Sequence, residues 1–225
     1  MNYQEKELQR LRLSVVLMMD YAKDQMQKAK KALLNEDMDL AEEVINNEAR
    51  VDAFDISINR DCENYIALHQ PVAGDLRLLV ALMRCVTSAE RIGDHANGIA
   101  KFLLNLNSNY SKQLLEELDM ARIFDNAIEM LENVIDAMED ENADIARQVF
   151  RKDKFLDSKN LESAQIIADY YVKDKNEDML SGLYLFRTIG KLERVGDLIK
   201  NIAEEIIFYL EATVLRHSKQ NKSKS

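Results

Sequence analysis

The pentapeptide Glu90-Arg91-Ile92-Gly93-Asp94 returns as Glu193-Arg194-Val195-Gly196-Asp197, a shift of 103 residues (193 − 90). An earlier segment repeats as well, because Asp39-Leu40-Ala41 returns as Asp144-Ile145-Ala146 with a shift of 105 (144 − 39). Self-similarity at a nearly constant period indicates an internal duplication. We therefore predict two copies of one unit, and the difference between the two shifts places two extra residues in the first copy, in the loop that contains Pro71.

Apolar residues recur at helical spacing within each copy. In the first copy they predict helices over Leu8–Leu33, Leu40–Tyr65 and about Asp75–Leu103. One Pro and six Gly leave long stretches without a helix breaker, and no alternating run of β-branched and aromatic residues predicts a strand. The predicted fold is all-α, with two tandem three-helix bundles, six long antiparallel helices in all, related by an internal pseudo-twofold axis.

The boundary between the copies is expected in the polar stretch Asn105–Ser111. This divides the chain into residues 1–107 and 108–217. Residues 218–225 contain no apolar side chain and are expected to form a disordered tail.

The composition limits where the protein works and what it binds. With 40 acidic and 30 basic residues the formal net charge is -10, which disfavours binding to a nucleic-acid backbone. No apolar run approaches the roughly 20 residues of a membrane span, and Met1–Arg10 is polar, so we expect a cytoplasmic protein. Cys62 and Cys85 fit no metal or redox motif and are expected to be small buried residues.

Acidic pairs four residues apart recur in both copies. Residues at this spacing share one face of a helix, and like charges there destabilise it unless a cation lies between them. Two such pairs on neighbouring helices would form a site for a hard cation such as Mg²⁺, Mn²⁺, Ca²⁺ or ferric iron. The alternative is a solvated acidic face, since pairs at this spacing also arise by chance in so acidic a chain. The pairs are Glu48 and Asp52 with Glu90 and Asp94 in the first copy, and Asp153 and Asp157 with Glu193 and Asp197 in the second.

Several other residues lie close to these pairs. Gly93 and Gly196 are expected to permit close approach of another helix or a ligand. Arg84 and Arg187 occupy equivalent positions and could neutralise the carboxylates, bind a phosphate or partner, or form surface ion pairs. His95 has Leu198 as its counterpart and is interpreted as a surface histidine.

Known catalytic patterns are absent from the sequence. None of the three histidines has a Glu three residues before it, as a di-iron bundle would require. No Gly-rich phosphate loop, nucleophile elbow or Ser/His/Asp constellation can be assembled. We therefore expect a non-enzymatic protein.

The two glycine-containing motifs, with the acidic pairs on the preceding helices, resemble the PhoU family over nearly the whole chain. The resemblance implies two three-helix repeats that bind metal ions or multinuclear clusters through the eight carboxylates named above, with iron, zinc, manganese or magnesium as the metal. Family members often have an Asn four residues after the motif's last Asp. The second copy keeps it as Asn201, whereas the first has Gly98 there and Asn97 one position earlier. Arg91 and Arg194 also match the motif, and with the two Asn residues they are candidate accessory polar groups.

The same resemblance implies a negative regulator of phosphate uptake and of the phosphate-starvation response. Its expected partners are the phosphate transporter ATPase subunit and the phosphate-responsive sensor histidine kinase, through peripheral association with membrane complexes; a homodimer is compatible with this role. Two alternatives stay open. One is a metal-dependent phosphatase or hydrolase that uses the paired carboxylates, and the other is a helical scaffold with solvated acidic faces.

Overall fold

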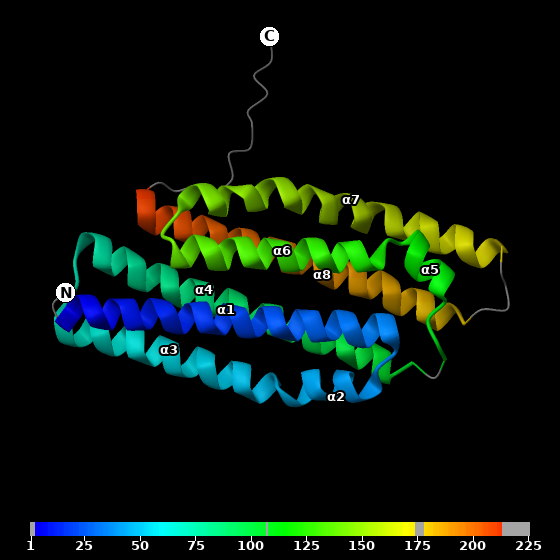
Figure 1. Cartoon of the computed structure of the whole chain (residues 1–225), viewed down its shortest axis with the longest axis horizontal. Coiled ribbons are helices and arrows are strands. Elements are labelled where there is room, and N and C mark those ends of the chain that lie inside the picture. The colour runs from blue at the N-terminus through cyan, green and yellow to red at the C-terminus, as the bar shows by residue number, and fades with distance from the viewer. Residues whose placement is uncertain (1–2, 107, 174–177, 213–225) are drawn as a thin grey trace, which may run out of the picture.

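The computed structural model describes residues 3–106, 108–173 and 178–212, and all regular structure in these ranges is helical (Figure 1). The predicted all-α fold is confirmed. No helix within these ranges is both long and apolar enough to cross a membrane. The predicted tail at residues 218–225 lies outside the described residues. The helices are α1 (Tyr3–Asn35), α2 (Met38–Asn46), α3 (Glu48–His69), α4 (Ala73–Leu104), α5 (Lys112–Glu117), α6 (Met120–Glu139), α7 (Ala143–Lys173) and α8 (Met179–Glu211).

Each copy supplies three rods to one elongated bundle. The first consists of α1, α2 with α3, and α4, and the second of α5 with α6, α7, and α8 (Figure 1). Helices α4 and α8 pack against each other across the contact between the copies, which we call the seam, and α1 also packs on α6. Buried apolar side chains from both copies form one continuous core. The hydrophobic stripes of α1, α4, α6 and α8 therefore also contribute to the contact between the copies.

The second rod of the first copy, predicted as one helix, is interrupted between α2 and α3. Asn47 ends α2 and begins α3, and its N–H contacts the carbonyls of both Glu43 and Ile45. The sequence there is Asn46-Asn47, whereas the equivalent positions in the uninterrupted α7 hold Arg151-Lys152. Asn has a lower helix propensity than Arg or Lys, which favours a break in the first copy over one in the second.

The first rod of the second copy is interrupted in a different way. Asp119 separates α5 from α6 and has a φ of 59°, in the left-handed region that Asp tolerates better than most residues. The equivalent stretch of the first copy lies within the continuous α1. The equivalent rods of the two copies therefore occupy equivalent positions, but they are interrupted at different places.

The predicted helix ends are confirmed at three connections. Asp37 caps α2 by accepting a hydrogen bond from the Leu40 N–H at 3.0 Å. Helix α3 ends at His69, before Pro71. Ser111 closes the polar stretch between the copies and caps α5. The sequence also predicts that the loop containing Pro71 is two residues longer than its counterpart in the second copy. That counterpart includes residues 174–177, which lie outside the described residues.

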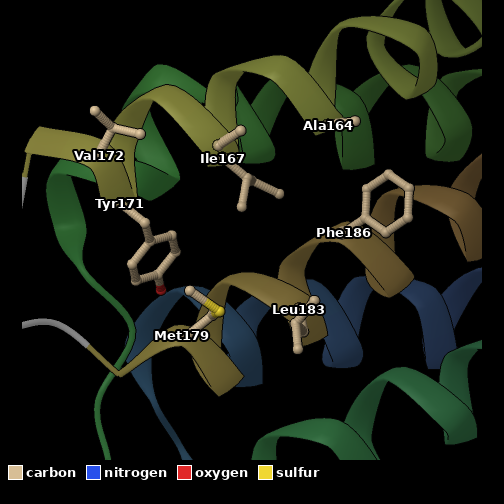
Figure 2. A pocket seen from close by; sticks show the side chains of 8 residues that line it. Ala164, Ile167, Tyr171, Val172, Met179, Leu183 and Phe186 are labelled. Carbon is tan, nitrogen blue, oxygen red and sulfur yellow. The ribbon is translucent and has the colours of Figure 1, made fainter. Parts of the chain in front are cut away.

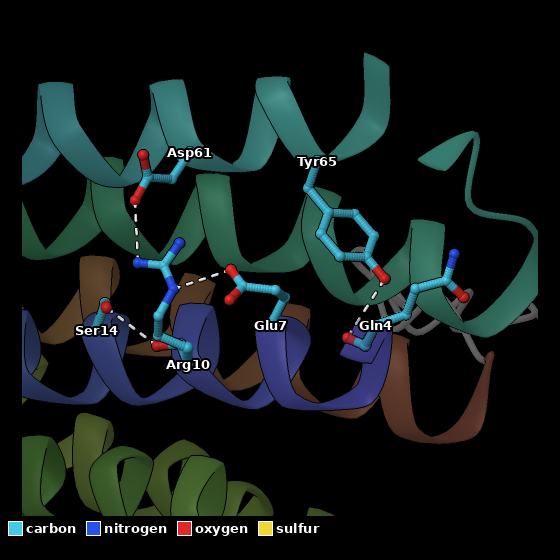
Figure 3. A network of polar contacts seen from close by, with 6 residues as sticks. All are labelled: Gln4, Glu7, Arg10, Ser14, Asp61 and Tyr65. Atoms are coloured by element: carbon cyan, nitrogen blue, oxygen red, sulfur yellow. Dashed lines mark hydrogen bonds and ion pairs between the residues drawn. The ribbon is translucent and has the colours of Figure 1, made fainter. Parts of the chain in front are cut away.

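Polar contacts fix α3 against the start of α1 (Figure 3). The Arg10 guanidinium donates to Glu7 Oε2 at 3.0 Å and to Asp61 Oδ2 at 3.1 Å, so one side chain on α1 reaches across to α3. One turn further along α3, the Tyr65 hydroxyl donates to the Gln4 carbonyl at 3.5 Å. These contacts hold α3 in place beside α1 at the end of α3 that lies away from α2 (Figure 1).

Candidate functional site

The four acidic residues predicted for the first copy gather where α3 passes α4. Glu48 and Asp52 come from α3, and Glu90 and Asp94 from α4. Burial raises the pKa of Asp94, and the negative charges of Glu48 and Asp52 raise it further. Burial and the charge of Asp94 likewise raise the pKa of Glu90. The four carboxylates thus lie close enough to repel one another, and we call them the first cluster.

A fifth carboxylate, Asp55, adjoins the first cluster and was missed by the sequence analysis. Its charge contributes to the raised pKa of Glu90. Burial raises the pKa of Asp55 itself, while a hydrogen bond from Asn59 opposes that shift. The equivalent residue of the second copy is Asn160, so a search for repeated acidic residues does not find this position.

The two motif glycines face the preceding helix of their own copy, and the approach is closer at Gly196 than at Gly93. A Cβ added to Gly93 would lie 3.4 Å from Val51 on α3, and one added to Gly196 would lie 2.7 Å from Leu156 on α7. Val51 and Leu156 are themselves equivalent under the shift of 105 (156 − 51). The prediction that these glycines permit close approach of another helix is confirmed, and the two copies use the same contact.

The second cluster contains Asp153 and Asp157 on α7 with Glu193 and Asp197 on α8, as predicted. It differs from the first in holding a lysine of the chain between carboxylates of its two helices. Lys200 Nζ lies 2.5 Å from Asp153 Oδ2 and 2.7 Å from Asp197 Oδ1, so its ammonium bridges the two helices.

One carboxylate of the second cluster is buried, whereas those of the first are all at least partly accessible. The Asp153 residue is only 5% exposed. Burial raises the pKa of Asp153 and the Lys200 ammonium opposes that shift. Burial disfavours the charged form of Lys200, but its bonds to Asp153 and Asp197 outweigh this and leave its pKa raised. A buried carboxylate and an ammonium therefore stabilise each other.

In the first copy the position of Lys200 is occupied by Asn97, since 200 − 103 = 97. Asn97 is 2% exposed, and its Oδ1 has no hydrogen-bond partner. At 100° per residue, Asn97 lies on α4 between the directions of Gly93 and Glu90, on the side that faces α3. Of the other accessory polar groups, Asn201, Arg91 and Arg194 are all exposed.

In the described part of the chain, no group of three or more His, Cys, Asp or Glu side chains is arranged so that it could hold a metal ion. The first cluster fits a hard cation in its chemistry, because it combines several carboxylates with a buried amide oxygen that lacks a partner. The second cluster does not fit one equally well, because Lys200 is already paired with two of its four carboxylates.

The two arginines that precede the motifs contact the opposite copy and not the acidic clusters. Arg84 on α4 forms an ion pair with Glu205 on α8, and Arg187 on α8 lies over the ring of Phe102 on α4 at 4.6 Å from its centroid. Arg84 is equivalent to Arg187 and Phe102 to Glu205 under the shift of 103. These reciprocal contacts show that the seam obeys the predicted pseudo-twofold symmetry. Of the roles considered for these residues, ion pairing is confirmed for Arg84.

His95 is half-buried at the seam, so its interpretation as a surface histidine is wrong. Burial lowers its pKa to about 4, and the positive charges of Lys191, Arg194 and Arg91 act in the same direction. The prediction for the two cysteines is confirmed, since Cys62 and Cys85 are both buried and unpaired.

An apolar groove of about 740 Å³ lies between the end of α7 and the start of α8 (Figure 2). Several of its side chains are well exposed, among them Val172 at 74%, Met179 at 60% and Leu183 at 51%. Sequence analysis missed this groove; exposed apolar residues on the outer face of the predicted helices were the available signal. The groove is lined by Ala164, Ile167, Ala168, Tyr171, Val172, Met179, Leu183 and Phe186, and we call it the α7–α8 groove.

Comparison with known proteins gives a consistent result for the whole chain. The profile of the PhoU domain matches residues 15–103 and again residues 120–206. The phosphate-specific transport system accessory proteins PhoU of Edwardsiella tarda and Escherichia coli K12 are each 32% identical to this chain, over 94% of it and 86% of their own length.

Solved structures agree with this assignment. The crystal structure of the phosphate transport system regulatory protein PhoU from Streptococcus pneumoniae superposes with a TM-score of 0.85 at 28% identity, covering 95% of this chain and 100% of its own. That of PhoU from Pseudomonas aeruginosa gives 0.83 at 27% identity, covering 93% and 99%. The duplicated motifs, the two three-rod copies and these matches together place the chain in the PhoU family.

Proposed function

We propose that this protein is an accessory component of a phosphate transport system and a negative regulator of phosphate uptake and of the phosphate-starvation response. The observation that carries the proposal is the sequence match to phosphate-specific transport accessory proteins over 94% of the chain, with the PhoU domain matched in both copies. Relatives with this name are accessory or regulatory proteins, which supports an adaptor role over catalysis.

An adaptor needs a surface that can bind its partner, and the α7–α8 groove supplies one. Its lining is almost entirely apolar, and it runs between two neighbouring helices, which suits the apolar face of an amphipathic helix. The equivalent face of the first copy is more polar, because Asn59 and Glu63 stand where Ala164 and Ala168 line the groove. We propose that the α7–α8 groove binds a helix of the transporter ATPase subunit. The acidic helix faces would then bind the sensor histidine kinase.

The first cluster is proposed as the metal site. Glu48, Asp52, Glu90 and Asp94 would hold the ion, with the Asn97 amide oxygen as a further ligand. A bound cation would supply positive charge where the protein alone presents repelling carboxylates. That change would fix α3 against α4 and reverse the local potential seen by a partner.

The regulatory role is tested in a strain that lacks its own PhoU protein. Expression of this chain should lower phosphate uptake and phosphatase reporter activity in phosphate-rich medium, and the purified chain should bind the purified ATPase subunit. Unchanged uptake and reporter activity, with no binding to either the ATPase subunit or the sensor kinase, would contradict the proposal.

Catalysis is the second candidate, and the buried carboxylates with raised pKa favour it, because Glu90 and Glu193 could donate or accept a proton. This candidate predicts turnover of a phosphate ester in the presence of Mn²⁺ or Mg²⁺. It also predicts loss of that turnover in Glu90→Gln and Glu193→Gln. An adaptor should show no turnover under either condition.

A further inference from the structure

We infer that Lys200 is the resident cation of the second cluster, so that this chain binds metal at the first cluster only. The inference rests on the proposed metal site of the first copy. It departs from the symmetry of the motifs, which predicts two equivalent metal sites.

The ammonium of Lys200 stands between carboxylates on two different helices. It lies 2.5 Å from Asp153 on α7 and 2.7 Å from Asp197 on α8. A divalent cation shared by α7 and α8 would compete with Lys200 for the same two carboxylate groups, although Asp153 Oδ1 has no hydrogen-bond partner. Metal binding would therefore displace Lys200 from both partners and leave a half-buried ammonium beside the ion, which is an unfavourable exchange.

The first copy has an equivalent pair of helices, but it has the neutral residue Asn97 at the position of Lys200. The contact of Gly93 with Val51 repeats as that of Gly196 with Leu156, so residues 97 and 200 leave their helices at equivalent places. Asn97 is a potential oxygen ligand with an unpartnered Oδ1, whereas Lys200 can only donate.

Two lysines lie near the first cluster, but neither is placed between its carboxylates as Lys200 is in the second cluster. Lys101 is exposed, and its Nζ lies 3.8 Å from Glu48 Oε2, at the limit of an ion pair. Lys191 reaches from α8 toward Gly98, and burial together with the charges of Arg187 and Arg194 lowers its pKa. The charges of both lysines favour the ionised form of Asp94, but neither ammonium forms an ion pair with carboxylates of both helices as Lys200 does.

The test measures Mn²⁺ binding to the full chain by titration calorimetry and by the metal content after dialysis. We expect the wild-type protein to bind Mn²⁺. Asp94→Ala should abolish this binding, and Asp197→Ala should leave it unchanged. Lys200→Asn, which gives the second copy the residue of the first, should raise the bound Mn²⁺ about twofold. Lys154→Asn, an exposed change on α7, is the matched control and should have no effect.

Each result separates this inference from the proposed metal function. If Asp197→Ala removes about half of the metal from the wild type, the second cluster binds metal despite Lys200, and the inference fails while the metal site stands. If the wild type binds nothing but Lys200→Asn does, Lys200 is confirmed as the resident cation and the first cluster loses its assignment. If neither binds, both fail.

A second measurement guards against misfolding of the variants. Lys200→Asn should lower the melting temperature in chelator, because Asp153 then lacks its partner, and Mn²⁺ should restore it. The same addition should not shift the melting temperature of Asp94→Ala. Full helicity by circular dichroism in all variants is required, and a Lys200→Asn protein that is equally stable with and without Mn²⁺ would contradict the inference.

Discussion

Arg84 on α4 and Glu205 on α8 are joined across the seam, with 2.9 Å between Nη1 and Oε1. The Glu205 side chain is 15% exposed while that of Arg84 is 50% exposed, so the pair lies at the edge of the interface. A double-mutant cycle with alanine should give a coupling free energy of about 0.2–1 kcal/mol, as expected for a partly solvated pair. Denaturant unfolding measures it, and Arg151→Ala, exposed on α7, should change stability little.

The two motif glycines should respond differently to alanine. Helix propensity favours either change by about 1 kcal/mol. At Gly93 the new methyl group would meet Val51 at an ordinary 3.4 Å, whereas at Gly196 it would lie 2.7 Å from Leu156 and 2.9 Å from Asp153 Oδ1. Overpacking of this kind costs about 1–3 kcal/mol.

Gly196→Ala should therefore be less stable than Gly93→Ala by about 1–3 kcal/mol in denaturant unfolding. Gly190→Ala is the control for helix propensity alone, because its Cβ would meet only Asn160 at 3.9 Å. Equal stability of the Gly93 and Gly196 variants would show that Leu156 moves aside without cost.

Protonation of His95 should destabilise the fold. Its pKa is about 4 in the folded chain and near the ordinary value of 6.5 when unfolded, so between these pH values the unfolded chain binds more protons. Stability should then fall as the pH decreases from about 6.5 toward 4. The buried carboxylates, whose pKa values are raised, act in the opposite direction.

His95→Leu isolates the contribution of the histidine, since Leu198 occupies the equivalent position in the second copy. The free energy of unfolding, measured in chelator at pH 7 and pH 5, should fall less for this variant than for the wild type. The carboxylates are common to both proteins. The same pH dependence in both would mean that the folded His95 titrates near its ordinary pKa.

A charge placed in the α7–α8 groove should weaken binding to the ATPase subunit. Leu183 is 51% exposed, so Leu183→Glu can be accommodated by the free protein but would bury a carboxylate beneath a docked helix. We expect at least about a tenfold loss of affinity by calorimetry with the purified subunit. Ile56→Glu is the matched control, as Ile56 is an apolar residue 66% exposed on α3. An equal loss in both variants would argue against the groove as the docking site.

The sequence predicted the features that depend on periodicity and duplication. Helical spacing from Leu8 to Leu33 identified α1, and the repeated motif located Gly93 and Gly196 at the helix contacts. The break at Asn47 was not predicted, because one unfavourable residue rarely ends an amphipathic helix, and only packing decides whether it does.

The difference between the two clusters could not be predicted from the sequence either, because it depends on the three-dimensional structure. Lys200 lies three residues after Asp197 and looks in the sequence like one more surface lysine. Its role follows from the position of Asp153 on another helix, which no local pattern reveals. The α7–α8 groove was missed for a related reason, since its lining is drawn from two helices and becomes a surface only when they pack.

The shared seam has a consequence for dissecting the molecule. Phe102 of the first copy stacks on Tyr184 of the second with 5.1 Å between ring centroids, and the buried stripe of α4 is completed by α8. Either half produced alone would present that stripe to water and would be driven to self-associate or to capture its missing counterpart. The repeat is therefore a unit of duplication, but it is not a unit that folds on its own. The two halves can be produced as separate chains only if they are co-expressed and allowed to associate.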